Sequence, residues 1–140
     1  GGTKKNPAKR KVSKNNNHRY LTTSKIRGMA RNGKITGFTS RVRLKEHFEK
    51  HVAEINKASG KNLSNEDSYR KEAISVTKEG RYVPKMHAFI KRISKARKNR
   101  DGFLYEFVGV DVKTGKITTL HIKTSRMLKK KGARVAWPNK

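Results

Sequence analysis

Apolar side chains recur every three or four residues between positions 40 and 80, which is the spacing of amphipathic helices. Ser40 is a suitable N-cap for a first helix, and Gly60 is expected to end it. The apolar positions of this helix are Leu44, Phe48, Val52 and Ile55. A second helix is expected to begin near Ser64, with Asp67 in a capping-box position, and to end at Gly80. Its apolar stripe consists of Tyr69, Ala73 and Val76.

Two further elements are expected around these helices. Pro84 is favoured in the first turn of a third helix. The apolar face of that helix would carry Met86, Phe89, Ile90, Ile93 and Ala96. Its other face would be basic, with Lys91, Arg92, Lys95, Arg97 and Lys98. Upstream, the turn-like pair Asn32-Gly33 within RNGKITGF favours a small hairpin.

The hydrophobic period changes from 3.6 to two after residues 101–102. The segments FLYEFVGVDV and ITTLHIKT then predict a β-hairpin closed by a two-residue turn at positions 114–115. That register pairs Val108 with His121 and places Glu106 diagonally opposite His121. The last segment, ARVAWPNK, is a candidate edge strand. Helices followed by strands predict the α+β class, with N-terminal helices packed on a C-terminal antiparallel β-sheet.

The length of 140 residues suits one domain with its own core. Residues 1–19 are rich in Lys and Arg and contain one branched apolar residue, Val12. Because this composition cannot bury enough apolar surface to fold alone, we expect a flexible basic arm or linker before a single domain over residues 20–140. The chain has neither an apolar run of ~20 residues nor a signal-peptide core at its start, so membrane insertion is not expected.

The excess of basic over acidic residues indicates the class of partner more clearly than any single motif does. Lys and Arg number 37 against 10 Asp and Glu, which gives a net charge of +27. Such a field attracts polyanions, so RNA or DNA is the expected partner, and binding should weaken steeply with salt. Anionic lipid is a weaker alternative, because no segment combines a long apolar face with a basic one. The candidate phosphate-binding residues are Lys91, Arg92, Lys95, Arg97, Lys98, Lys123, Arg126, Lys129 and Lys130.

Metal and cofactor sites are not expected. The chain has no cysteine, which excludes zinc ribbons, thiol nucleophiles and disulfide scaffolds. His47 and His51 are four residues apart on the first helix, but a zinc-protease motif needs a glutamate directly after the first histidine. Phe48 occupies that position.

The same histidines have acid–base and purely structural interpretations. His51 lies within the apolar stripe of its helix and His47 on its flank, where an imidazole is either a satisfied core residue or a catalyst. Thr119 and His121 share one face of the last strand and Lys123 follows on that face, although solvated strand residues would show the same pattern. Glu106 could equally form a simple cross-strand ion pair with Lys123.

These residue types match the needs of RNA cleavage without a metal. One group takes the proton of the 2′-hydroxyl, a second donates a proton to the leaving 5′-oxygen, and a cation or hydroxyl stabilises the phosphorane. Histidine suits either proton role because its ordinary pKa lies near neutrality. The candidate catalytic residues are His51, His47, His121, Thr119 and Glu106.

The order of three segments resembles a known nuclease superfamily. RLKEHFEKH on the first helix, YRKEA on the second and YEFVGVDVKTGKITTLHIKT as the hairpin look like the ribonucleases related to barnase, EndoU, colicin D and RelE. They look most like the toxin domains of polymorphic bacterial toxins and phage head proteins, over roughly residues 36–125. The resemblance implies a four-stranded antiparallel sheet, metal-free cleavage and cyclic-phosphate products. It assigns His51, or alternatively His47, as the helix histidine, Thr119 as the strand hydroxyl, and Lys123 or Arg126 as the phosphate-binding cation.

Two functions follow as expectations. The first is a cytotoxic endoribonuclease that cleaves tRNA or another structured RNA to 2′,3′-cyclic phosphate ends. It would be the C-terminal toxin domain of a larger delivered protein, would act in the cytoplasm of a target cell, and would need an acidic inhibitor or immunity protein. The second is a non-catalytic structural protein, ribosomal or phage-internal, that binds RNA or DNA. The two differ in what the histidines do.

Overall fold

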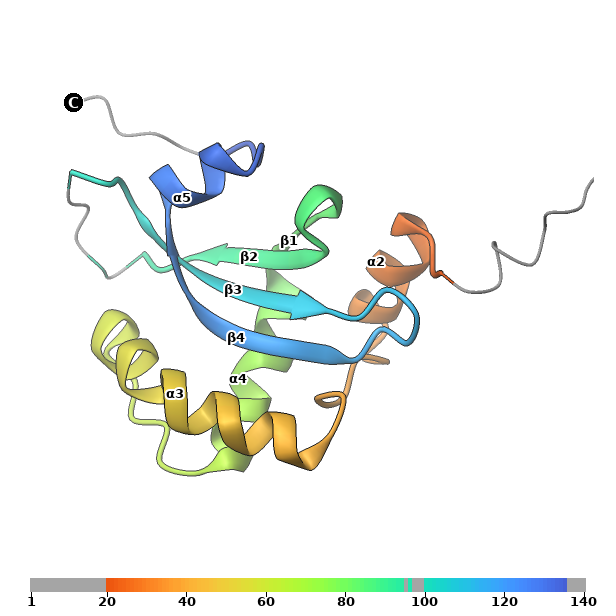
Figure 1. The fold of residues 1–140 in the computed structure, drawn as a ribbon, viewed down its shortest axis with the longest axis horizontal. Coiled ribbons are helices and arrows are strands. Elements are labelled where there is room, and N and C mark those ends of the chain that lie inside the picture. Colours follow the sequence, from red (N-terminus) through yellow and green to blue (C-terminus); the bar gives the residue numbers. More distant parts are fainter. Residues whose placement is uncertain (1–19, 95, 97–99, 136–140) are drawn as a thin grey trace, which may run out of the picture.

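A computed structural model describes residues 20–94, 96 and 100–135 of the chain. Three helices come first: α2 (Thr23–Arg31), α3 (Arg41–Ser59) and α4 (Glu66–Glu79). The strands are β1 (Arg81–Val83), β2 (Ala88–Arg92), β3 (Leu104–Val110) and β4 (Ile117–Thr124), with a 3-10 helix at Pro84–Met86. The helix α5 (Ser125–Lys130) follows β4. The strands form one antiparallel sheet in the order β1-β2-β3-β4, so the predicted α+β class is confirmed (Figure 1).

The caps of α3 and α4 largely follow the sequence signals. Ser40 is the N-cap of α3, and its hydroxyl accepts a hydrogen bond from the main-chain N–H of Arg43. Gly60 ends α3 in the left-handed conformation, with a φ of 75°. The helix α4 begins one residue later than expected, because Asn65 is its N-cap and Ser68 completes the capping box.

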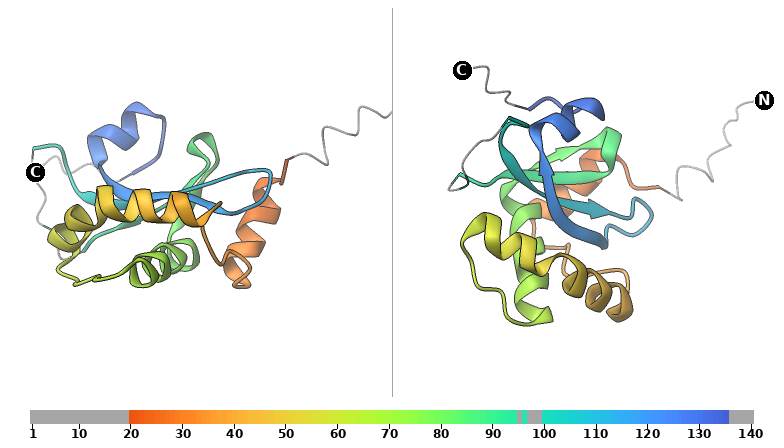
Figure 2. Two further views of the ribbon diagram at one scale, coloured as in Figure 1. Left: turned by 60° about the horizontal axis from the view of Figure 1, so that its bottom comes forward. Right: turned by 60° about the vertical axis from the view of Figure 1, so that its left-hand side comes forward.

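Two apolar clusters hold the sheet between helices. The helices α2, α3 and α4 pack on one face, where Tyr69, Ala73 and Val76 of α4 are fully buried as predicted. The other face packs against α5 through a smaller cluster that includes Phe107 and Leu128. Figure 2 shows α5 and α4 on opposite sides of the sheet.

The helix α3 also runs along β4, one of the two edge strands of the sheet (Figure 1). Three side chains satisfy main-chain groups on the open side of β4. Arg43 reaches the carbonyl of Thr118, the Tyr69 hydroxyl donates to the carbonyl of Leu120, and the Glu54 carboxylate accepts from the N–H of Ile122. These contacts cover an edge that would otherwise be free to pair with another chain. We call this contact line the α3–β4 seam, formed by residues 43–54 of α3 and 118–122 of β4.

The prediction of a third helix after Pro84 is wrong. Residues 88–92 form β2, which is hydrogen-bonded to β1 on one side and β3 on the other. Both faces of β2 are covered, with Phe89 in the helix-side cluster and Ile90 in the cluster under α5. A strand buried on both faces lacks a clear period of two, and its apolar run is easily taken for part of a helix.

The expected hairpin around positions 32–33 is also wrong. Residues before it form α2, which Thr22 caps, and Phe38 makes one isolated parallel bridge with Ile117. Within the ARVAWPNK segment, the described residues 133–135 form no strand, and the remainder lies outside the described residues. The predicted arm at 1–19 lies outside them too.

The β3–β4 hairpin exists, but its register differs from the expected one. An irregularity between Gly109 and Val110 shifts the pairing, and the connection is longer than two residues because the N–H of Asp111 bonds to the carbonyl of Lys116. His121 therefore pairs with Phe107 rather than Val108. A shift of one residue moves each side chain of β3 to the other face relative to β4.

Candidate active site

The α3–β4 seam brings four of the predicted catalytic residues together. His47 and His51 project from successive turns of α3, with ring centroids 5.5 Å apart. Thr119 and His121 alternate on β4, and the ring of His121 lies 5.0 Å from that of His51. The helical repeat of four and the strand repeat of two thus place two pairs of side chains against each other.

A chain of hydrogen bonds runs through three of these residues. A guanidinium can only donate, so the 3.3 Å contact from Arg43 Nη1 makes Nε2 of His47 an acceptor. The proton of neutral His47 then lies on Nδ1, which donates to Thr119 Oγ1 over 2.8 Å. The Thr119 hydroxyl in turn points its own proton towards Nδ1 of His121, 3.4 Å away. Nδ1 of His121 is thus the acceptor of the hydrogen bond at the end of this network.

His121 is partly buried between the sheet and α3. Its ring stacks on Phe107 with a centroid distance of 5.0 Å. Burial, with the nearby charges of Lys123 and His51, lowers its pKa to about 4. Its Nε2 atom is buried and has no hydrogen-bond partner among the described residues. At neutral pH this imidazole is uncharged, with Nδ1 as its acceptor nitrogen and its proton on Nε2.

His51 is held between the helix and the edge strand. Its side chain is 13% exposed, and Nδ1 lies 3.5 Å from Glu54 Oε1. That distance permits an ion pair when the imidazole is protonated, but Nδ1 makes no hydrogen bond within the described part of the chain. The other carboxylate oxygen of Glu54 is fixed by the N–H of Ile122, so the acid is positioned by the strand.

His47 lies nearer to solvent at the start of the seam. Partial burial lowers its pKa, and the positive charges of His51 and Arg43 lower it further. Both His47 and His121 are therefore neutral at pH 7 and able to accept a proton.

Arg43 belongs to the site although the sequence analysis did not single it out. Its exposed guanidinium contacts Nε2 of His47 and, at 3.5 Å, the carbonyl of Thr118. The sequence signal that could have found it is its position four residues before His47, which places the two on the same side of a helix. A guanidinium at this position is suited to bind a phosphate beside the histidines.

Glu106 does not join the histidines, so its expected position opposite His121 is wrong. Its register partner is Ile122, and its side chain is buried on the helix side of the sheet, 4% exposed. Burial and the neighbouring carboxyl of Glu72 raise its pKa to about 8. Lys61 neutralises Glu72 through an ion pair of 2.8 Å. The shifted hairpin register is the reason for the change of face.

The predicted phosphate-binding residues do not form one stripe. Lys123 lies on the His121 face, with Nζ 5.1 Å from the centroid of Phe107. Lys91 pairs with Glu79, Arg126 pairs with Asp101, and Arg92 lies over the ring of Phe103. Lys129 and Lys130 are exposed in the last turn of α5. Lys95, Arg97 and Lys98 lie outside the described residues.

Within residues 20–94, 96 and 100–135, no group of three or more His, Asp or Glu side chains is placed to hold a metal ion. Comparison of the chain with protein-family models, with curated proteins and with solved structures found no match. The functional assignment therefore depends on the residues of the seam and on their geometry.

Proposed function

We propose that the chain is an endoribonuclease that cleaves RNA without a metal, with its active site in the α3–β4 seam. The observation that carries the proposal is the chain from Arg43 through His47 and Thr119 to His121, with His51 packed against its end. A histidine-bearing helix beside a threonine-bearing strand of a four-stranded sheet is also what the resemblance to the barnase, EndoU, colicin D and RelE superfamily implies.

The reaction needs one proton acceptor and one proton donor. A neutral imidazole takes the proton of the 2′-hydroxyl, the 2′-oxygen forms a bond to phosphorus, and the bond from phosphorus to the 5′-oxygen breaks. His121 suits the accepting role because its pKa of about 4 keeps it neutral. His51 suits the donating role because its protonated form can pair with Glu54. Arg43 and Lys123 would hold the phosphate, and a 2′,3′-cyclic phosphate end results.

The wider setting of the activity is part of the same proposal. The net charge of +27 supports a structured RNA such as tRNA as substrate, and an acidic immunity protein as the inhibitor of a delivered toxin. In the part of the chain that the structure describes, no helix is long and apolar enough to cross a membrane.

A non-catalytic RNA- or DNA-binding role is the second candidate. Its support is that His51 and His121 are largely buried and pack on neighbouring rings, as structural histidines do. In that case the seam would serve only to cover the edge of β4, and the basic surface would be the functional part.

The deciding experiment is incubation of the protein with total tRNA in excess EDTA, with the products resolved on a denaturing gel. His51→Ala and His121→Ala are expected to lower the cleavage rate by about 10² to 10⁴-fold while RNA binding persists. His87→Asn is a matched control, because His87 is exposed outside the seam and Asn tolerates its positive φ of 51°. RNA that is retarded on a native gel but stays intact would contradict the ribonuclease and favour the second candidate.

A further inference from the structure

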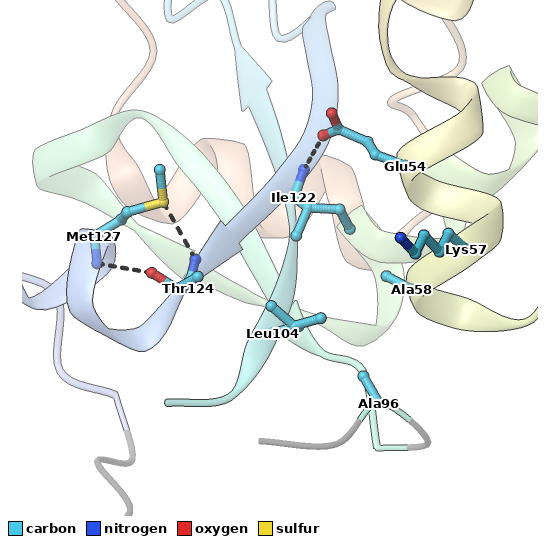
Figure 3. Close-up of a pocket in the computed structure, with 8 residues that line it drawn as sticks. All are labelled: Glu54, Lys57, Ala58, Ala96, Leu104, Ile122, Thr124 and Met127. Carbon is cyan, nitrogen blue, oxygen red and sulfur yellow. Dashed lines mark hydrogen bonds between the residues drawn. The ribbon is translucent and has the colours of Figure 1, made fainter. Parts of the chain in front are cut away.

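An open cavity continues the α3–β4 seam beyond His51. Its volume is about 610 Å³, which is within the range of small-molecule binding pockets. Its lining includes Glu54, Ala58, Leu104, Ile122, Thr124 and Met127 (Figure 3). The walls thus come from the C-terminal half of α3, the ends of β3 and β4, and the start of α5.

Glu54 connects this cavity to the candidate active site. One carboxylate oxygen lies 3.5 Å from His51 Nδ1, and the other accepts from the N–H of Ile122, which lines the cavity. Glu54 and Ala58 follow His51 by one and two turns of the same helix, so the cavity begins about 5 Å along the helix axis from that histidine. A nucleotide whose phosphate lies at the histidines can therefore extend its base into the cavity.

The chemistry of the walls matches a nucleobase. Ala58, Leu104 and Ile122 present apolar surface, and Met127, 47% exposed, adds a thioether that adapts to a ring. The carboxylate of Glu54 and the hydroxyl of Thr124 stand in the same lining and can meet the polar edge of a base. RNA-binding proteins recognise bases in this way, by contact with the ring faces and hydrogen bonds to the edges.

Charge favours a nucleotide over an apolar small molecule. Lys57 also lines the cavity, and its ammonium can meet the phosphate that follows the bound base. Among the described residues that line the cavity, Glu54 alone carries a carboxylate, within a chain of net charge +27. The net positive charge attracts a polyanion to the molecule, and the apolar cavity lies beside the candidate catalytic groups.

We propose that this cavity holds the unpaired base of a nucleotide next to the cleaved phosphate. The proposal rests on the ribonuclease function and narrows its substrate class. A base inside a duplex would have to leave its stack to enter the cavity, so cleavage is directed to loops and single-stranded stretches of RNA.

The experiment measures the binding of oligonucleotides, so its result can be interpreted whether or not the protein cleaves RNA. Short single-stranded oligonucleotides with deoxyribose throughout lack the 2′-hydroxyl nucleophile, and each position in turn is made abasic. Removal of one base is expected to weaken binding to the unmodified protein by about 5 to 100-fold, because its contacts with the apolar walls of the cavity are lost. Ala58→Phe fills the cavity and should bind all the oligonucleotides equally weakly.

Two further variants keep the test decisive. Ala53→Phe places the same side chain on an exposed position of α3 and should retain the full dependence on the base. Met127→Ala removes an exposed wall of the cavity and should reduce that dependence even if Ala58→Phe fails to fold. An Ala58→Phe or Met127→Ala protein with the same base dependence as the unmodified protein would overturn the proposal.

The RNA version of each oligonucleotide separates the two proposals. If the RNA is cleaved, and removal of each base next to the cleaved phosphate changes neither binding nor cleavage, the proposed role of the cavity is wrong. The proposed ribonuclease activity would still be supported. If binding depends on a base but none of the RNA versions is cleaved, the proposed ribonuclease activity is wrong. The base would then not lie beside a cleaved phosphate.

Discussion

Arg43 contacts both a candidate catalytic side chain, His47, and the main chain of β4 through its guanidinium. Arg43→Ala is expected to lower kcat by about 10² to 10³-fold, the usual cost of removing one donor to a developing anion. Arg43→Lys should recover only part of this loss, because an ammonium lacks the planar fork of a guanidinium.

Single-turnover cleavage of a defined RNA measures the effect of Arg43. Arg41→Ala is the control, since Arg41 is exposed on the first turn of the same helix and makes no contact with the histidines among the described residues. Equal rates for Arg43→Ala and Arg41→Ala would remove Arg43 from the mechanism.

The burial of His121 predicts a dependence of stability on pH. Its pKa in the folded protein is about 4, below the ordinary 6.5, so the unfolded chain takes up a proton at this group at higher pH than the folded protein does. Its contribution to the free energy of unfolding is therefore complete above about pH 6.5 and is lost as the pH drops towards 4.

His121→Asn should remove the part of the pH dependence that His121 contributes, whereas His87→Asn should leave the stability curve unchanged. Urea unfolding at several pH values between 4 and 7 measures the slope. The lowered pKa values of His47 and His121 also place the acidic limb of the kcat/KM profile below pH 6.5. Parallel stability curves for the unmodified protein and His121→Asn would contradict the assigned burial.

At the scale of elements, the end of α3 depends on a glycine. Gly60 has a φ of +75°, where a side chain is strained even though open space surrounds the position. Gly60→Ala is expected to lower the free energy of unfolding by about 1 kcal/mol.

Gly28 lies inside α2 and has no positive φ, and a methyl group added there would meet no atom of the described residues within 4 Å. Gly28→Ala should therefore raise the free energy of unfolding by about 0.5–1 kcal/mol. Thermal unfolding of the two variants should show shifts of opposite sign.

At the scale of the whole molecule, the charge of +27 governs association with RNA. If six or more phosphates are contacted, affinity should fall by about 10³-fold or more between 50 and 200 mM salt. Lys130→Ala, an exposed change in the last turn of α5, should weaken binding and reduce the slope of log K against log salt by about one unit if Lys130 meets a phosphate. Filter binding over a salt series measures both values, and an unchanged slope would exclude Lys130 from the interface.

Local signals were sufficient for part of this molecule. The caps at Ser40 and Gly60, the stripe of Tyr69, Ala73 and Val76, and the alternation in the last strand each reflect interactions within a few residues, so the sequence by itself determined α3, most of α4 and the existence of the β3–β4 hairpin. The same alternation placed Thr119 and His121 on one face, because the pleat of a strand has a fixed period of two.

Other features depended on contacts between distant segments. Residues 88–92 are a strand because β1 and β3 pair with them on both sides, and the irregularity at Gly109 turned Glu106 away from His121. Arg43 and the cavity beyond His51 became visible only when α3 was packed along the edge of β4. Tertiary structure alone decided these points. The choice of strand partners and of hairpin register depends on the free energy of the whole sheet with its helices, and a local segment of sequence does not contain that information.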